Sequence, residues 1–510
     1  MRKPIRIWGG VAAIALLGGC ALVDTSKTAA VQTEDSYYAD AQARLGEIAA
    51  RKPNTKRAKN VILFVGDGMG VSTVTAARIF EGQQRGVDGE SNVLSFEAFP
   101  YLALSKTYAH DAQVSDSAPT AVAMTTGAKT KNDIIGLNQD ALLENCEDSK
   151  DKHLTTLWEM AEQAGLATGV ITTARLTHAT PSATYAHSAS RDWESDADMS
   201  EEALAQGCPD IAAQLVDFSY GDGIEIAMGG GRDRFLPASS ADPEDEGKTG
   251  KRNDGRDLTA EWVAQYGDGG AYVWNAEQFN ALDFGKAKHV LGLFNRSHLE
   301  YEADRAKDAG GEPSLAEMTG AAIDMLSADP DGFLLMVEGG RVDHASHESN
   351  AYRMLTDAVA LNEAIKTALD KVDTDETLII VTADHSHTLT INGYPKRGNP
   401  ILGLARGVDG ELILGDDNKP YTTLSYANGP GGQLEGARAD LTEVDTTDPD
   451  FIQQALVPLS SETHAGEDLG IYATGPWAHL FQGTVEENYI FHVMDHASQI
   501  GAKAAAKAAN

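Results

Sequence analysis

NVILFVGDGMG, residues 60–70, is the stretch that decides the fold class. Its first part, VILFV, is apolar without interruption, which is typical of a strand buried on both faces of a parallel sheet. The run ends at a Gly-Asp-Gly turn that contains Asp67, and VSTVTAARIFEG, residues 71–82, then has the pattern of a helix. The stretch therefore predicts a strand–turn–helix unit of an α/β protein.

The same rhythm recurs further along the chain. Helical segments precede apolar, strand-like runs: HLTTLWEMAEQA before GLATGVITT, DIAAQLVDFS before GIEIAMGGG, SLAEMTGAAIDMLS before GFLLMVEGG, and AYRMLTDAVALNEAIKTALDK before TLIIVTADH. Alternating helices and buried strands predict a doubly wound, mostly parallel sheet with helices on both faces. No repeat of fixed period is visible, which excludes solenoids and propellers.

The 510 residues are expected to form one large domain with additions. We predict an α/β domain over residues 59–498, with surface insertions at about 232–331 and 390–462, where stretches rich in Gly, Asp and Pro interrupt the rhythm. Residues 21–58 are predicted to form a tether and an N-terminal helix, because EDSYYADAQARLGEIAARK has helical spacing of its apolar residues. Residues 499–510 are predicted to form a helical tail.

The N-terminus has the features of an export signal over residues 1–20. MRKPIR is basic, and IWGGVAAIALLGGC is a short apolar run that is too short for a membrane span. The segment LGGC resembles a bacterial lipoprotein processing site with Cys20 as the lipid-bearing residue, and a plain cleaved signal is the alternative. We therefore expect an exported, periplasmic protein that is lipid-anchored, and the absence of an acidic residue at Ala21 favours the outer membrane.

Composition and charge restrict the possible partners. Hydrophobic residues make up 42% of the chain, which indicates a globular protein. The formal net charge of -35 argues against a nucleic-acid partner and against docking on anionic lipid heads, so the membrane is expected to be contacted only through the lipid anchor. After Cys20, two cysteines remain, Cys146 and Cys208, which could pair in an exported protein. The residues alone leave that pairing open.

Several of the predicted strands end near carboxylates, histidines or a threonine. These residues are Asp67 after VILFVG, Glu338 in FLLMVE, Asp384 and His385 in LIIVTADH, and His178 and Thr180 after GVITTARL. The carboxyl ends of parallel strands lie at one edge of a sheet, where ligands bind. A single acid after a strand is often only a helix cap, but clustered acids repel one another unless a cation neutralises them. The sequence therefore predicts a metal site at this edge.

The segment LLMVEGGRVDHASHESN, residues 334–350, adds further metal ligands. Asp343 and His347 are four residues apart and share one face of a helical turn. A carboxylate with an imidazole suits zinc, whereas the harder ligand Glu338 suits magnesium. His464 in THAGEDLG, taken alone, is interpreted as an ordinary loop histidine.

Ser117, in VSDSAPTAVAMTTG, is the candidate nucleophile. Pro119 in the first turn fits the start of a helix. Ser117 would then lie at a helix N-terminus, where backbone N–H groups and the helix dipole favour an anion. The alternative is that Ser117 only caps the helix, and the sequence does not separate the two roles.

Six motifs together resemble the alkaline phosphatase family. They are NVILFVGDGMG, DSAPTA, THATPSATYAHSASRDW, EGGRVDHASHES, TADHSHT and ETHAGEDLG, in the family's order, over about residues 39–496. The pattern is most similar to animal-type and some marine bacterial members, because His178 stands where other bacterial members have an acid. The resemblance implies a homodimeric enzyme that hydrolyses small phosphate monoesters to alcohol and inorganic phosphate through a phosphoserine intermediate.

The resemblance also implies two Zn²⁺ and one Mg²⁺ per chain. The first zinc would be held by Asp343, His347 and His464. The second would be surrounded by Asp67, Asp384, His385 and Ser117. Magnesium would be bound by Asp67, Thr180 and Glu338.

Other family positions imply supporting roles. Arg191 would clamp the phosphate with both arms of its guanidinium, and Asp116 would orient Arg191. The histidines expected to support the metal ligands are His178, His344 and His387. Cys146 and Cys208 stand where animal-type members have a disulfide.

The sequence departs from the family pattern in two places. Pro119 replaces a small residue and gives a Ser-x-Pro-x-Ala motif that half resembles a sulfatase signature, although Ala121 stands where that signature needs arginine. The calcium site of animal-type members is matched only in part. Glu244 and the region around Phe294 match, but Asn295 and Glu312 stand where those members have other residues.

Two rival functions follow from the residues. The first is a phosphodiesterase or another hydrolase of the same superfamily. Comparing the rates on mono- and diester substrates would distinguish it from a monoesterase. The second is a lipoprotein that captures phosphate or metal without turnover. A degraded ligand set would favour the second rival, and none of the expected ligands is missing.

Overall fold

The computed structural model describes residues 32–509. Internal contacts divide the chain into two units, Met1–Lys52 and Pro53–Asn510. In the first unit, α2 (Ser36–Ala50) follows Asp35, whose side chain accepts a hydrogen bond from the backbone N–H of Tyr38 at 3.0 Å. All residues of α2 are exposed. The predicted signal segment and Cys20 lie outside the described residues.

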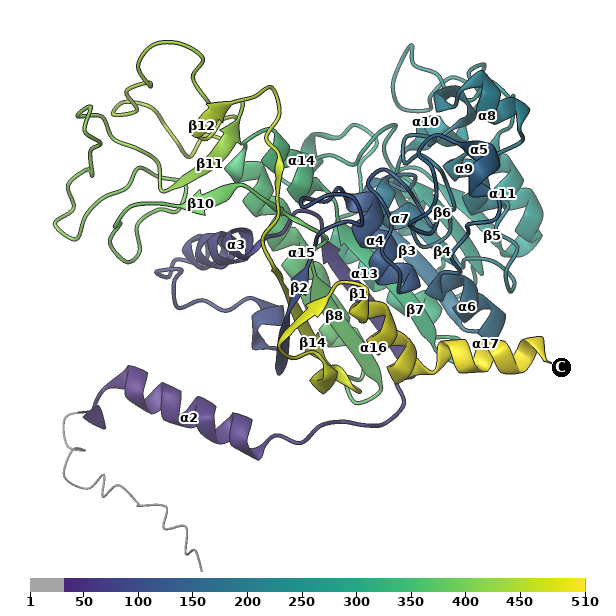
Figure 1. The fold of residues 1–510 in the computed structure, drawn as a ribbon, viewed down its shortest axis with the longest axis horizontal. Coiled ribbons are helices and arrows are strands. Elements are labelled where there is room, and N and C mark those ends of the chain that lie inside the picture. The colour runs from purple at the N-terminus through teal and green to yellow at the C-terminus, as the bar shows by residue number, and fades with distance from the viewer. Residues whose placement is uncertain (1–31, 510) are drawn as a thin grey trace, which may run out of the picture. The chain divides into compact units, whose positions relative to one another are not determined.

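A ten-stranded sheet forms the centre of the second unit (Figure 1). Its strands, in spatial order, are β15 (Thr484–Glu486), β2 (Tyr101–Lys106), β14 (Leu469–Thr474), β8 (Thr377–Thr382), β1 (Asn60–Gly66), β7 (Phe333–Gly339), β3 (Ala167–Arg175), β4 (Ile226–Gly230), β6 (His289–Leu293) and β5 (Gly270–Val273). Neighbouring strands are parallel except where β14 pairs with β2 and β8. The predicted doubly wound, mostly parallel sheet is confirmed.

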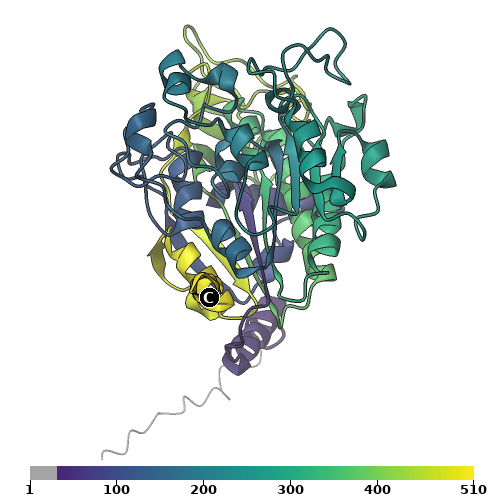
Figure 2. The same ribbon diagram turned by 90° about the vertical axis from the view of Figure 1, so that its right-hand side faces the viewer.

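Successive residues of β1 belong to two different cores, because side chains alternate across a strand. Ile62 and Phe64 pack with one set of helices: α3 (Val71–Gln84), α13 (Leu315–Leu326) and α15 (Ala351–Lys371). Leu63, on the other face, packs with a second set: α4 (Ser117–Thr126), α6 (Leu157–Ala164), α9 (Ile211–Val216), α16 (Tyr489–Ser498) and α17 (Ile500–Ala508). Figure 2 shows helices on both sides of the sheet, which accounts for the unbroken apolar run of β1.

The helices begin where the sequence supplies capping side chains. Thr156 and Glu159 form a reciprocal capping box at the start of α6, and Ser314 does the same with Glu317 at α13. Asn350 caps α15 by accepting a hydrogen bond from the N–H of Arg353 at 3.0 Å. These caps fix where the segments between the strands become helical.

The two segments predicted as insertions differ in structure. Residues 232–331 include β5 and β6, which extend the main sheet, as well as α13. Residues 390–462 carry most of a separate small sheet of β10 (Leu389–Ile391), β11 (Leu424–Gly429) and β12 (Ala455–Pro458) (Figure 1). The domain boundaries proposed from the sequence stay a prediction.

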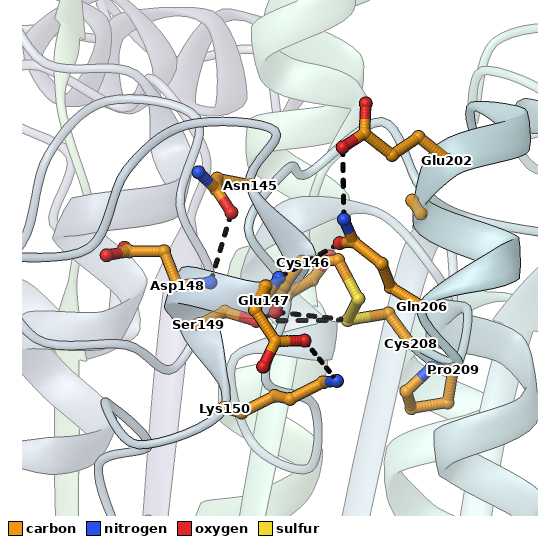
Figure 3. The surroundings of a disulfide bond; sticks show 12 residues. Asn145, Cys146, Glu147, Asp148, Ser149, Lys150, Glu202, Gln206, Cys208 and Pro209 are labelled. Carbon is orange, nitrogen blue, oxygen red and sulfur yellow. Dashed lines mark hydrogen bonds and ion pairs between the residues drawn. A yellow bond between two sulfur atoms is a disulfide. The ribbon is translucent and has the colours of Figure 1, made fainter.

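A disulfide links Cys146 and Cys208 (Figure 3). Their Cα atoms are 5.9 Å apart, and 62 positions separate them in sequence. The bond ties the start of α5 (Cys146–Ser149) to the segment after α8 (Glu201–Ala205). The Ser149 hydroxyl donates a hydrogen bond to the Cys146 carbonyl at 2.7 Å. The pairing that the family resemblance implied is thus confirmed in the structure.

Removing this disulfide is expected to destabilise the protein. Closing a loop of this length in the unfolded chain is worth about 4 kcal/mol in the loop-entropy description. We therefore expect the Cys146→Ala/Cys208→Ala variant to lose up to about 4 kcal/mol of unfolding free energy in denaturant titration. Thiol counting on the oxidised, denatured protein should find neither residue reactive, and two free thiols at these positions would contradict the pairing.

Candidate active site

Four adjacent strands deliver polar side chains to one edge of the sheet. β8, β1, β7 and β3 are neighbours, and Glu338 of β7 lies between Val65 of β1 and Thr172 of β3 in register. Asp67 follows the end of β1, and Asp384 follows the end of β8. Asp67, Glu338 and Asp384 are completely buried. The fold therefore brings together the strand-end acids that the sequence singled out.

Asp343, His347 and His464 form a first cluster. Asp343 and His347 lie one turn apart on α14 (Arg341–His347), and His347 Nε2 is 3.3 Å from Asp343 Oδ1. His464 Nε2 lies 3.4 Å from the same carboxylate oxygen and 3.2 Å from His347 Nε2. His464 reaches this place because β13 (His464–Ala465) pairs antiparallel with β9 (Ser386–His387).

Asp67, Asp384, His385 and Ser117 form a second cluster. His385 Nε2 lies 3.3 Å from Asp67 Oδ1 and 3.4 Å from Asp384 Oδ2. The same nitrogen is hydrogen-bonded to Ser117 Oγ at 3.1 Å. The ring of His385 stacks on that of His464, with ring centroids 3.5 Å apart, so the two clusters are adjacent.

The third cluster is richer in oxygen. One ligand atom each of Asp67, His178 and Glu338 lie within 4.8 Å of one another. The Thr172 hydroxyl donates to Glu338 Oε2, and the completely buried Thr180 interacts with the same carboxylate. Burial raises the pKa of Glu338 to about 7, and the charge of Asp384 acts in the same direction. Thr172, which lies three residues before the end of β3 and is paired in register with Glu338, was not predicted.

The three clusters have the chemistry of cation sites. Within residues 32–509, four buried carboxylate oxygens of these clusters have no hydrogen-bond partner: both oxygens of Asp67, Asp384 Oδ2 and Glu338 Oε1. Burial raises the pKa of Asp67 well above its usual range, and the neighbouring carboxylates raise it further. On a tetrahedral zinc ion with bonds of about 2.1 Å, neighbouring ligand atoms are ~3.4 Å apart. The distances given above within the first two clusters are similar. Zinc and magnesium therefore fit these residues.

Glu462 is a polar residue of the site that the sequence analysis missed. Its carboxylate accepts a hydrogen bond from His387 Nδ1 at 2.5 Å, while His387 Nε2 lies 2.8 Å from Asp343 Oδ1. Burial acts to lower the pKa of His387, but the bonds to Asp343 and Glu462 raise it to about 9. Glu462 precedes His464 by two residues in SETHAGEDLG, which is the only signal that could have pointed to it.

The pKa of Asp343 is shifted in the opposite direction from that of Asp67. Burial acts to raise the pKa of Asp343, but hydrogen bonds from His347, His387 and His464 hold it well below the usual range. Asp343 is therefore ionised among imidazoles, which is the state in which a carboxylate binds a metal.

The local structure separates the two roles considered for Ser117. Asp116, and not Ser117, caps α4, because its side chain accepts the N–H of Ala118 at 2.6 Å. Ser117 is the first helical residue and is 2% exposed. Its hydroxyl is directed to His385 and is not used as a cap. The capping interpretation of Ser117 is therefore wrong.

Arg191 lies beside Asp116 and His178. Its Nη1 donates to Asp116 Oδ1 at 3.1 Å, and its Nη2 lies 3.0 Å from His178 Nε2. Asp116 is itself fixed by the N–H of Asp133, which donates to Oδ2 at 2.6 Å. The guanidinium is thus held against Asp116, the residue that caps the helix beginning at Ser117.

His344 is turned away from the first cluster. Its ring lies 4.0 Å from that of His298 and 5.5 Å from that of His178, measured between ring centroids. Its Nδ1 lies 3.2 Å from Arg341 Nη1. His344 and His298 thus both pack against the ring of His178. His298 is a neighbour of His178 that the sequence did not single out.

The partly matched calcium region is occupied by internal hydrogen bonds. Glu244 pairs with Arg232 at 2.8 Å. Glu312 accepts hydrogen bonds from Asn295 Nδ2 at 2.8 Å and from the N–H of Glu300 at 2.9 Å. Both carboxylates therefore already have donors.

The site combines three features that suit phosphoryl transfer. They are a hydroxyl at a helix N-terminus, a fixed guanidinium and adjoining clusters of possible metal ligands. They define a metal-dependent enzyme that transfers a phosphoryl group, because each neutralises or orients negative charge. Residues 58–500 match the alkaline phosphatase family, and the chain belongs to that family.

Known alkaline phosphatases resemble the chain closely. It is 45% identical to the tissue-nonspecific isozyme of Gallus gallus over 454 residues, which cover 88% of this chain and 86% of the relative. The Thermus thermophilus enzyme has the same fold, with a TM-score of 0.63, 24% identity and coverage of 91% and 97% of the two chains. A TAB5 alkaline phosphatase mutant from an Antarctic bacterium, whose structure has Mg bound, aligns with a TM-score of 0.60 at 23% identity over 87% and 99% of the chains.

Family membership decides between the functions considered above. The protein is a phosphatase that hydrolyses phosphate monoesters. No relative named here favours the phosphodiesterase alternative. Among residues 32–509, no helix combines the length and the apolar composition that crossing a membrane requires.

Proposed function

We propose that this enzyme hydrolyses small phosphate monoesters through a phosphoserine formed on Ser117. The observation that carries the proposal is the position of the Ser117 hydroxyl. Its oxygen is 3.1 Å from His385 Nε2, and that nitrogen lies within 3.4 Å of Asp67 and Asp384. A hydroxyl in contact with a cation site is an activated nucleophile.

The three clusters are proposed to hold two zinc ions and one magnesium ion. The first zinc takes Asp343, His347 and His464. The second takes Asp67, Asp384, His385 and Ser117. Magnesium takes Asp67, Thr180 and Glu338, which offer only oxygen, the ligand type that it prefers.

Bound zinc and magnesium supply positive charge and Lewis acidity to the phosphoryl oxygens and to the Ser117 hydroxyl. The Ser117 hydroxyl passes its proton to solvent as Oγ attacks phosphorus, so that the bond from Oγ to phosphorus forms while the bond from phosphorus to the alcohol oxygen breaks. The alcohol leaves with a proton from solvent. A water molecule then attacks phosphorus, the bond to Ser117 breaks, and the hydroxyl regains its proton as inorganic phosphate leaves.

Arg191 is proposed to bind two phosphoryl oxygens, with Asp116 holding its guanidinium in place. His178, which contacts the other arm of the guanidinium, limits its rotation. His387 and Glu462 are proposed to orient Asp343. His344 is proposed to support His178 through packing.

Replacing Arg191 with lysine is expected to lower kcat/KM about 10- to 100-fold, because one charge-assisted hydrogen bond is worth about 1.5–3 kcal/mol. A lysine ammonium cannot bridge Asp116 and two phosphoryl oxygens in one plane. Steady-state kinetics on a chromogenic monoester, together with the inhibition constant of inorganic phosphate, measures the effect. A variant that binds phosphate as tightly as the parent enzyme would refute this role.

Metal removal provides the test of the proposed function as a whole. Elemental analysis should find two zinc ions and one magnesium ion per chain. Chelation should abolish monoester hydrolysis, and adding both metals back should restore it. The rate on a chromogenic monoester should greatly exceed that on the matching diester. A faster diester reaction would favour the rival hydrolase, and metal binding without turnover would favour the capture protein.

The location of the protein and its oligomeric state are also proposed. The LGGC segment supports export to the periplasm with a lipid on Cys20, and a Cys20→Ala variant should then be released from the membrane fraction. Family resemblance supports a homodimer, which light scattering would measure. Calcium is left out of the proposal, because Glu244 and Glu312 already have hydrogen-bond partners.

A further inference from the structure

Three carboxylates converge at the edge of the sheet opposite the active site. Glu162 lies in the last turn of α6, and Asp222 and Glu225 lie in the connection between α9 and β4. One carboxylate oxygen of each lies within 4.8 Å of the others. The group adjoins the residues where β3 and β4 begin, whereas the active-site residues follow the strand ends.

Glu162 is buried and has one oxygen without a hydrogen-bond partner. It is 2% exposed, and its Oε1 accepts a hydrogen bond from Thr168 Oγ1 at 2.6 Å. Among the residues that the structure describes, its Oε2 has no hydrogen-bond partner, and neither has the buried hydroxyl of Tyr266 at the end of α11 (Leu258–Tyr266). A buried carboxylate oxygen without a donor is costly, so it points to a group that completes it.

The backbone closes over these two oxygens. A Cβ added to Gly221 would lie 2.4 Å from Glu162 Oε2, and one added to Gly223 would lie 2.2 Å from the Tyr266 hydroxyl oxygen. Asp222 stands between these glycines and is exposed. Side chains are therefore kept out of the space beside Glu162 Oε2, while Asp222 keeps one side of the group open to water.

No cationic side chain compensates the group. Within residues 32–509, no lysine, arginine or histidine nitrogen forms an ion pair with Glu162, Asp222 or Glu225. Burial raises the pKa of Glu162 to about 8. Burial and the charge of Glu162 raise the pKa of Glu225 to about 10. Glu162 and Glu225 are thus stable side by side only with a bound proton or a bound cation.

We propose that Glu162, Asp222 and Glu225 bind a divalent cation of the calcium type. The donors are all oxygens, with no imidazole or thiolate, which excludes a preference for zinc. Calcium accepts irregular arrangements of six to eight oxygens and keeps waters where the site is open, whereas magnesium demands near-octahedral geometry. The cation joins α6 to the start of β4, and its role is structural because it lies at the far edge of the sheet.

The test is calcium binding to the full-length enzyme with its zinc and magnesium supplied in excess. Equilibrium dialysis with labelled calcium counts the ions bound per chain in the parent, in Glu162→Gln, in Asp222→Asn and in Asp217→Asn. Asp217 is the matched control, since it lies in the same connection but pairs with Arg256 at 2.9 Å. A terbium ion bound at this site would lie close to the ring of Tyr266. Terbium luminescence sensitised by that ring therefore reports binding at the same site.

The proposal predicts one calcium ion fewer per chain in Glu162→Gln and Asp222→Asn, and the parent number in Asp217→Asn. Calcium should raise the Tm of the parent and of Asp217→Asn but not of the other two, with phosphatase activity at room temperature unchanged in all. Equal calcium counts in all four proteins would overturn the proposal, because the acids would then be holding protons. Asp222 is exposed, so its variant remains informative if Glu162→Gln fails to fold.

Discussion

Replacing Ser117 with alanine is expected to lower kcat on phosphate monoesters by at least about a thousandfold, as removal of a catalytic nucleophile does in other covalent hydrolases. No other hydroxyl is hydrogen-bonded to His385 Nε2 among the described residues. Without Ser117 Oγ, the oxygen that bonds to phosphorus is lost, and only direct attack by water remains. The proposed metal ligands are untouched except for that oxygen, so zinc and magnesium content should stay close to that of the parent.

Ser115→Ala is the matched control for Ser117→Ala. It removes a hydroxyl two residues away that donates to the Asp116 carbonyl at 2.8 Å. The Ser115 carbonyl, which lies 2.8 Å from His464 Nδ1, is kept. Steady-state kinetics and elemental analysis on both variants measure the difference. If Ser117→Ala turns over as fast as Ser115→Ala while both keep their metals, Ser117 is not the nucleophile.

Replacing Asp67 with asparagine is expected to lower both metal content and activity. Asp67 belongs to two of the proposed ligand groups, the magnesium group with Thr180 and Glu338 and the second zinc group with Asp384 and His385; it also belongs to two of the carboxylate–histidine clusters in the structure. Asparagine keeps the volume but removes the negative charge that holds the cations. We expect at least one metal ion fewer per chain and a loss of activity of about a thousandfold or more, because catalysis here depends on charge stabilisation.

Metal analysis after dialysis, followed by the assay, checks the Asp67→Asn prediction. Asp111→Asn is a suitable control, because its carboxylate is exposed and accepts only the N–H of Asn132 at 3.1 Å. High concentrations of zinc and magnesium should restore part of the activity of Asp67→Asn, since affinity is what the substitution lowers. An Asp67→Asn enzyme with the full metal complement and full rate would remove the shared-ligand role.

The sheet and its acidic edge were predictable from local sequence. Unbroken apolar runs such as VILFV require burial on both faces, and parallel strands carry the residues that follow them to one edge. Asp67, Glu338 and Asp384 therefore converge for reasons that are visible in the chain. The helical spacing of Asp343 and His347 was predictable in the same way.

Contacts between distant segments were not predictable from local sequence patterns, although the family resemblance implied that Asp343, His347 and His464 share one zinc. His464 alone was interpreted as a loop histidine, and only its pairing with His387 across β13 and β9 brings it to Asp343. Glu462 depends on the same pairing. The role of Ser117 was ambiguous because capping and catalysis use similar residues, and the structure separated them by making Asp116 the cap.

The central claim is that Ser117 becomes covalently phosphorylated, and an acid quench tests it most directly. Enzyme mixed with excess phosphate monoester is stopped in acid, where phosphoserine is stable, and its peptides are analysed by mass spectrometry. The account predicts phosphate on Ser117 of the peptide containing VSDSAPTAVAMTTG, in the metal-loaded enzyme and not in Ser117→Ala. Active enzyme that yields no phosphorylated Ser117, or that carries the phosphate on another residue, would contradict it.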